Sequence, residues 1–162
     1  MFLRVHASGQ TFGFKVFAGD ERLNTDSSYT LLRYHCIPEL KQINGGSLDN
    51  MHWQQDGASC HRAGRNIHYL EGQFGDRLFA KGSRIGKNWP ARSPDLNVMD
   101  FCIWGWLKPR ISVPPMPTTI PELIDKLNVE IAQIPPQLIR NACASVYDRC
   151  QRILDADGGF IE

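Results

Sequence analysis

The 162 residues fit one domain, and a hydrophobic content of 42% is enough to form a buried core. A formal net charge of +1 excludes an overall basic field that attracts nucleic acid indiscriminately, so any such contact must come from a local patch. The five cysteines show no Cys-x-x-Cys spacing, which favours reduced thiols over structural zinc. With no signal peptide and no apolar run of about 18 residues, we expect a soluble intracellular protein without membrane contact.

The amino-terminal part of the chain predicts a hairpin followed by a helix. Short apolar and alternating segments indicate strands over 1–5 and 12–18. Apolar residues at helical spacing then indicate a helix over 27–40, with Asp26 or Ser27 available as its N-cap.

A strand, a helix and a second strand are predicted next. The short strand covers 51–55 and ends at Asp56. A weaker helix covers 63–74 and is ended by Gly75, and a further strand covers 76–80. Asp56 is thereby placed at the carboxyl end of a strand, where an open sheet commonly presents functional groups.

A Gly-rich loop over 81–89 carries the basic residues Lys81, Arg84 and Lys87. These side chains are candidates for contacts to DNA phosphates, because the glycines would let the backbone approach closely. The alternative is a basic loop that is simply solvated.

The carboxyl-terminal part predicts three helices separated by a Pro-rich segment. The first is expected from Pro94 to about Lys108. The second covers 121–131, with Thr119 and Glu122 as a capping box. The third starts at Pro135-Pro136 and is ended by 157–159. Asp95 lies in the first turn of the first of these helices, where a carboxylate serves as a structural cap. Asp100 lies further along the same helix and competes with Asp95 as a ligand for a divalent cation.

Two motifs resemble the core signatures of the mariner-like transposases, which have a DDE/D catalytic domain. The first is Gln-Gln-Asp-Gly-Ala over 54–58 with His61, and the second is Ser-Pro-Asp-Leu-Asn over 93–97 with Asp100 and the Trp-Gly pair at 104–105. Ile-Pro-Pro at 134–136 and Asp-Gly-Gly at 157–159 are similar to the tail of insect-type members. Ser59 and Val98 stand where that family usually has proline.

The resemblance implies an α/β fold of the ribonuclease H-like type, in which helices flank a mixed sheet, followed by a carboxyl-terminal helical pair. We therefore expect a partial catalytic domain over 1–112, a Pro-rich linker over 113–121, and helices over 122–162 that pack on the same domain. The family's first strand, which carries its first acid, would precede the hairpin and is expected to be missing. Because that strand is central in the sheet, its absence would leave two edges unpaired and favour marginal stability or self-association.

The resemblance also implies the chemistry of the site. Asp56 matches the family's second acid and Asp100 its third, as catalytic residues and as ligands of Mg²⁺ or Mn²⁺ for cutting and joining DNA. His61 is expected either to help position a phosphate or a neighbouring carboxylate, or to form a structural hydrogen bond. The implied partners are DNA at transposon ends, a second copy of the chain or a full-length transposase, in the nucleus.

Three functions are compatible with these residues. The chain is a transposase fragment that is inactive alone, a domesticated module that binds nucleic acid or a partner without chemistry, or a nuclease with a two-acid site. The third is the weakest, because two carboxylates poorly fix two cations.

Overall fold

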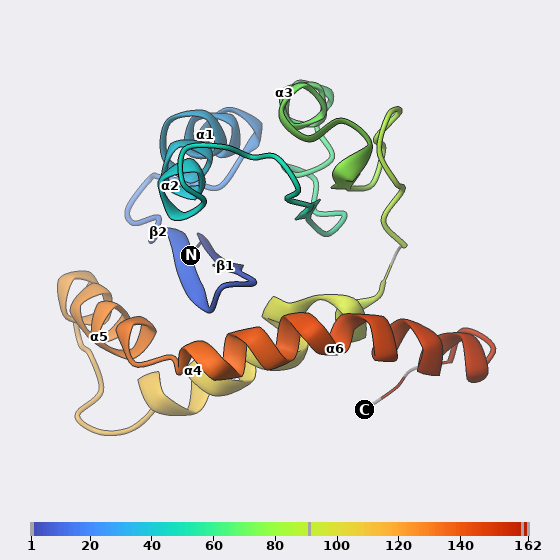
Figure 1. Cartoon of the computed structure of the whole chain (residues 1–162). Helices are drawn as coiled ribbons and strands as arrows, with labels where there is room; N and C mark the ends of the chain where they lie inside the picture. The colour runs from blue at the N-terminus through green and yellow to red at the C-terminus, as the bar shows by residue number, and fades with distance from the viewer. Residues whose placement is uncertain (1, 91, 160, 162) are drawn as a thin grey trace. The chain divides into compact units, whose positions relative to one another are not determined.

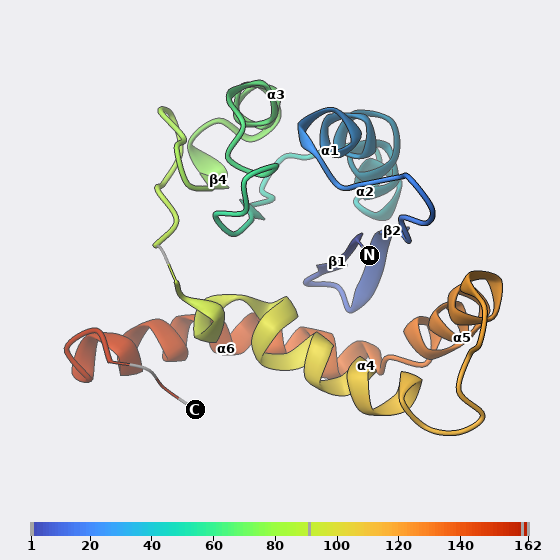
Figure 2. The same cartoon turned by 180° about the vertical axis from the view of Figure 1, so that it is seen from behind.

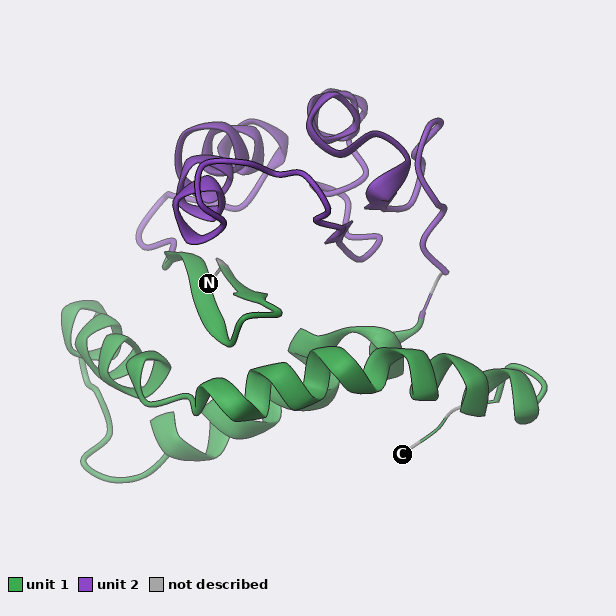
Figure 3. Ribbon diagram, viewed as in Figure 1, with its two compact units in different colours: residues 1–16, 93–162 green, residues 17–92 purple. Residues whose placement is uncertain are grey.

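The structure is a computed structural model that describes residues 2–90, 92–159 and 161. It combines helices with two small sheets, which confirms a mixed α/β chain (Figure 1). The chain divides into two compact units, one formed by 1–16 with 93–162 and the other by 17–92 (Figure 3). In the described residues, no helix has both the length and the apolar character that crossing a membrane requires.

The first unit opens with the predicted hairpin. Strands β1, Phe2–His6, and β2, Gln10–Lys15, pair antiparallel, and His6 lies opposite Gln10 across the turn. The amide of Gly9 donates to the carbonyl of His6 at 2.9 Å and closes that turn. The hairpin is therefore confirmed, although β2 ends before the predicted boundary at residue 18.

The rest of the first unit is helical. Its elements are η3 (Pro94–Leu96), η4 (Met99–Ile103) running directly into α4 (Trp104–Ile111), α5 (Ile120–Ala132) and α6 (Pro136–Asp155). Both views of the cartoon show α4 alongside α6 (Figures 1 and 2). The predicted N-cap of α5 is confirmed, because the Thr119 hydroxyl accepts from the Glu122 amide at 3.3 Å. The Glu122 carboxylate also accepts from the amide of Thr118 at 2.8 Å and from its hydroxyl at 3.0 Å.

One apolar core joins the hairpin to these helices. Leu3 of β1 is buried together with residues in or next to the continuous η4–α4 helix, α5 and α6. They are Val98, Ile103, Leu107, Leu127, Ile131, Ile134, Ile139 and Ala142. The Arg140 guanidinium of α6 donates to the carbonyl of Ser8 in the hairpin turn at 2.9 Å. This shared core ties both ends of the chain together, so the boundaries between the two units fall after residue 16 and after residue 92.

The predicted continuous helix from Pro94 to Lys108 is wrong. Pro94 opens only the 3₁₀ turn η3, and Asn97 then leaves the helical conformation with ψ of 110°. A new helix starts beyond Asn97, whose carbonyl accepts from the amides of Asp100 and Phe101. The Asn97 side chain supplies a fresh cap at this point, and asparagine is among the residues that favour such a position.

The second unit begins with one long helix made of α1 (Thr25–Leu31), η1 (Leu32–Cys36) and α2 (Ile37–Ile43). Its N-cap is Asn24, which accepts from the amides of Asp26 and Ser27, so both predicted caps are corrected. The segment η1 is a π-helical turn, and Pro38 is the second residue of α2, which continues the helix. Because proline lacks an amide hydrogen and crowds the preceding turn, a widened turn there lets the helix continue.

The remainder of the second unit is a parallel strand pair with a helix between its strands. Strands β3 (Trp53–Gln54) and β4 (Leu78–Phe79) are joined by α3 (Gly64–Phe74) and the short turn η2 (Gly75–Arg77). Trp53 packs on Phe74 with ring centroids 5.4 Å apart, and both are buried. Gly75 ends α3 with φ of 57°, as the sequence predicted.

Candidate functional site

Asp56 directly follows β3, and the structure brings it together with His61. Atom Nδ1 of His61 donates to Oδ1 of Asp56 at 2.6 Å, and the Ala58 amide donates to the same oxygen at 3.1 Å. The Asp56 side chain is nevertheless 46% exposed. The carboxylate is therefore held in place by its own loop while remaining accessible from solvent.

Two buried amides shape the loop between Asp56 and His61. The Gln55 side chain donates to the carbonyl of His61 at 2.9 Å, and the Asn66 side chain donates to the carbonyl of Cys60 at 2.7 Å. Asn66 also reaches the carbonyl of Thr25 at 3.3 Å and so fixes the start of α1. Because buried polar groups are costly unless they are paired, these bonds select one loop conformation.

His61 itself is largely buried. Its second ring nitrogen, Nε2, is buried without a hydrogen-bond partner in the described part of the chain. One nitrogen therefore orients the Asp56 carboxylate, and the other contributes nothing to the loop.

The basic loop after β4 is held by Glu71 on α3. The Glu71 carboxylate accepts from the Arg84 amide at 2.6 Å, the Ser83 hydroxyl at 2.9 Å and the Ile85 amide at 3.2 Å. These bonds, led by the one from the Arg84 amide, hold the pKa of Glu71 below its usual range. The loop is therefore fixed through its backbone, and the Arg84 side chain is exposed.

Two further contacts fix the loop against β4 and the Asp56 segment. The Lys87 amide donates to the Leu78 carbonyl at 2.7 Å, and Gly86 lies so close that a Cβ there would be 2.2 Å from that carbonyl oxygen. The Lys81 side chain passes over Gly57, where a Cβ would be 3.1 Å from its Cδ. The positive charge of Lys81 is therefore carried by a side chain that packs next to the Asp56 loop.

Asp100 lies in the first unit, at the start of η4. Its Oδ2 accepts from the Asn97 side chain at 2.8 Å, and the Asn97 Oδ1 in turn accepts from the Met99 amide at 3.3 Å. The residue is exposed. Asn97 therefore both starts the helix and orients the Asp100 carboxylate.

Asp95 differs from Asp100 in burial and in role. It is 9% exposed, and its Oδ2 accepts from the Ile161 amide at 3.5 Å instead of capping the predicted helix. The carbonyl of Asp95 accepts from Nε of Arg149 on α6 at 2.5 Å, and the Arg149 guanidinium lies 4.2 Å from the Phe101 ring centroid. The helix cap expected at Asp95 is thus supplied by Asn97, and Asp95 instead joins η3 to later parts of the chain.

The predicted site residues consequently fall in both units. Asp56, His61, Lys81, Arg84 and Lys87 belong to the second, whereas Asp95 and Asp100 belong to the first. Within the described ranges no three His, Cys, Asp or Glu side chains form a group suited to a metal ion. Each of the five cysteines is a free thiol.

Sequence reasoning missed three residues that build the site: Gln55, Asn66 and Glu71. Asn66 precedes Ile67 and lies four residues before Leu70 on the buried side of α3, so a polar residue in an apolar stripe was an available signal. Glu71 gave no comparable signal, because its partners lie in a loop beyond β4. Neither the family models, the curated proteins nor the solved structures that were compared with this chain gave a match.

Proposed function

We propose that this chain is part of a mariner-like DDE/D transposase with a ribonuclease H-like fold, and that the 162-residue polypeptide binds DNA without cutting it. The motifs around Asp56 and Asp100 support the family. The order of a hairpin, a helix, a strand that ends at an acid, and a helix leading to a parallel strand supports the fold.

The observation that carries the proposal is the 2.6 Å contact between His61 and Asp56. A buried framework of Gln55 and Asn66 holds this loop, yet the carboxylate it presents remains accessible. The arrangement is suited to a carboxylate that must keep one orientation for an incoming ligand.

Asp56 and Asp100 fit Mg²⁺ or Mn²⁺ by the chemistry of their donor atoms. Both are accessible carboxylates, and hard divalent cations prefer oxygen ligands and retain several waters. When bound, the cation supplies positive charge to a phosphodiester under attack.

The chain's own residues have separate tasks in this proposal. His61 orients the Asp56 carboxylate and Asn97 orients that of Asp100. Lys81, Arg84 and Lys87 meet the DNA phosphates from a loop whose backbone is already fixed by Glu71. A fixed loop loses little conformational entropy when it binds, which favours affinity.

The test uses the whole polypeptide with a labelled DNA duplex and with supercoiled plasmid in MnCl₂. We expect binding of the duplex at low salt and no nicked plasmid. Replacing Lys81, Arg84 and Lys87 with alanine should weaken duplex binding. The slope of the logarithm of the binding constant against the logarithm of the salt concentration should also become shallower, by about 0.9 for each lost phosphate contact. Absence of duplex binding at low salt would refute the proposal.

Metal binding is read separately, from the free Mn²⁺ signal in electron paramagnetic resonance. Asp56→Asn and Asp100→Asn should each weaken Mn²⁺ binding, whereas Asp125→Asn, an exposed acid on α5, should leave it unchanged. Plasmid nicking that disappears in Asp56→Ala and in Asp100→Ala would instead establish an active two-acid nuclease.

A domesticated module without chemistry is the second candidate. The basic loop favours it, because Glu71 fixes that loop without help from Asp56 or Asp100. In this case the double variant Asp56→Asn/Asp100→Asn would bind duplex as the parent does, and Mn²⁺ would not change its affinity. A second copy of the chain or a full-length transposase is the proposed protein partner, and the nucleus the proposed location.

A further inference from the structure

A cluster of tyrosine and arginine side chains lies on the second unit, apart from the candidate acids. Tyr29 on α1 is its centre. The Arg65 guanidinium from α3 lies 3.7 Å from the Tyr29 ring centroid, and Arg33 from η1 donates to the Tyr29 hydroxyl at 2.7 Å. Tyr69 meets the same ring edge to face, with centroids 5.5 Å apart. Tyr29 thus holds two guanidinium groups that come from two different helices.

Tyr34 presents an open aromatic face beside this cluster. Tyr34 is the residue after Arg33 in η1, and it is 63% exposed. The Arg33 guanidinium lies 5.6 Å from the Tyr34 ring centroid, within the range of a cation–π contact. An exposed ring with a guanidinium next to it suits a ligand that offers both a π face and negative charge.

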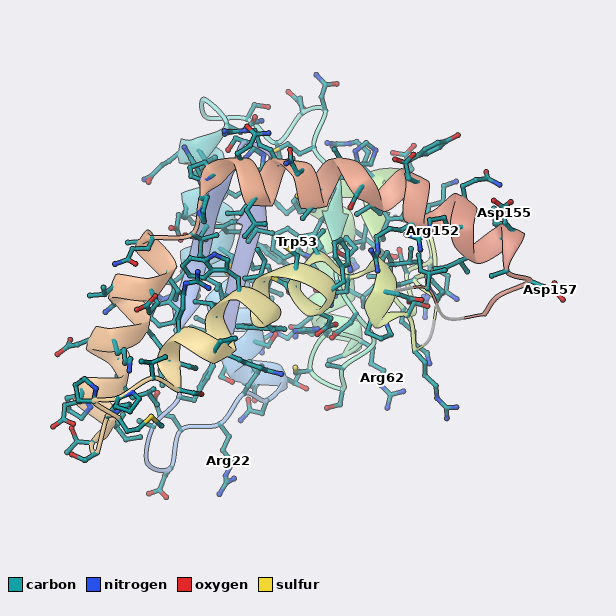
Figure 4. The ribbon with its side chains drawn as sticks, turned by 90° about the horizontal axis from the view of Figure 1, so that it is seen from below. Arg22, Trp53, Arg62, Arg152, Asp155 and Asp157 are labelled. Atoms are coloured by element: carbon teal, nitrogen blue, oxygen red, sulfur yellow. The ribbon has the colours of Figure 1, made fainter. Side chains whose placement is uncertain are left out.

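The charges of the cluster favour a polyanion. Asp26 pairs with Arg65 at 3.0 Å and offsets one charge, while Arg33 forms no ion pair among the residues that the structure describes. Exposed His68 lies three residues after Arg65 on α3, and exposed Arg62 precedes that helix, with a side chain that extends away from the ribbon (Figure 4). The Arg33 guanidinium next to Tyr34 is thus the charge that would meet a polyanion.

We propose that Tyr34, Arg33 and Arg65 form a binding site for single-stranded nucleic acid, with an unpaired base stacked on Tyr34 and a phosphate next to Arg33. Unpaired bases expose their π faces and carry a phosphate at each step, which matches an aromatic ring flanked by guanidinium groups. A duplex hides those faces within its stack. An acidic peptide would match the arginines and leave the exposed ring unused.

The site uses neither Asp56 nor Asp100, so it does not depend on the proposed transposase function. Its test can therefore fail or succeed independently. The variant Asp56→Asn/Asp100→Asn should keep its affinity for a single strand even where duplex or Mn²⁺ binding is changed.

The experiment measures the fluorescence anisotropy of a labelled ten-nucleotide oligothymidine at low salt with the whole polypeptide. Tyr34→Ala should weaken binding by roughly tenfold, as loss of one stacked base does elsewhere, and Tyr34→Phe should retain it. Tyr147→Ala is the matched control, because Tyr147 on α6 is 78% exposed and lies outside the cluster. Arg33→Gln should make the slope of the logarithm of the binding constant against the logarithm of the salt concentration shallower by about 0.7, the value for one phosphate of a single strand.

Circular dichroism and a thermal melt of each variant check that the fold is retained. Equal affinity of the parent and Tyr34→Ala, or an equal loss in Tyr147→Ala, would overturn the proposal. The proposal would also be overturned if polyglutamate competed as strongly as unlabelled oligothymidine at the same concentration of negative charge. The surface would then recognise negative charge without a base.

Discussion

The carboxylate of Glu71 on α3 accepts a hydrogen bond from the backbone amide of Arg84 at 2.6 Å, and this contact sets the shape of the basic loop. The Ser83 hydroxyl and the Ile85 amide bind the same oxygen. One acidic side chain therefore uses its charge to order a basic loop through the backbone, and the basic side chains do not have to pair with it.

Replacing Glu71 with glutamine tests this contact. Glutamine keeps an acceptor oxygen but loses the charge, and hydrogen bonds to a charged acceptor are the stronger ones. We expect faster hydrogen exchange at the Arg84 and Ile85 amides and a loss of about 1 kcal/mol in unfolding free energy, a value reduced for solvent exposure. Glu130→Gln on α5 is the control. Unchanged exchange over 81–88 would contradict the role of Glu71.

The same contact predicts a pH dependence of stability. Because hydrogen bonds from the loop lower the pKa of Glu71 in the folded state, the unfolded chain takes up the proton first on acidification. The contribution is complete above the ordinary glutamate pKa of about 4.3, and it is lost as the pH falls through the lower folded-state value. Urea titrations of the parent and Glu71→Gln should differ at pH 7, and the difference should shrink as the pH falls below the ordinary glutamate pKa. A constant difference would show that the charge of Glu71 is irrelevant.

Asn66→Ala should destabilise the second unit by about 2 kcal/mol. The substitution leaves the carbonyls of Cys60 and Thr25 without their side-chain donor, and one of these bonds is fully buried. Chemical denaturation measures the loss. Asn128→Ala, at an exposed position on α5, should change stability by less than about 0.5 kcal/mol. Comparable effects of the two substitutions would exclude a special role for Asn66.

Two glycines should respond in opposite directions to alanine. At Gly86 a Cβ would be 2.2 Å from the Leu78 carbonyl oxygen, so Gly86→Ala must displace the loop and should cost about 2 kcal/mol or more. Gly72 lies on the exposed side of α3 with no atom within 4 Å of its Cβ position. Gly72→Ala should therefore raise the unfolding free energy by about 0.5–1 kcal/mol. Thermal melts of both variants measure these changes. Melting temperatures that shift in the same direction in both variants would contradict the prediction.

The elements that the sequence predicted well are those with local signals. Proline at the start of α6, Thr119 before α5 and Gly75 after α3 mark helix ends within a few residues. Alternating apolar residues likewise predicted the hairpin. The cap at Asn97 was missed because the first-turn signal of Pro94 also fits a single 3₁₀ turn that ends there.

The features that the sequence did not predict depend on distant contacts. Leu3 shares a core with Ile139, and no periodic pattern near either residue indicates that pairing. The residues of the candidate site showed the same contrast. Asp56 and His61 lie five positions apart in one motif, whereas Gln55, Asn66 and Glu71 act through backbone groups that only the folded loop brings to them.

The core shared by the hairpin and α6 has a consequence for synthesis on the ribosome. The hairpin is made before α6, and Leu3 cannot be buried with Ile139 until α6 follows, about ten seconds later at ordinary translation rates. Residues 17–92 form a continuous unit and need no such wait. Nascent chains should therefore acquire a folded middle while both strands of the hairpin still require protection from aggregation.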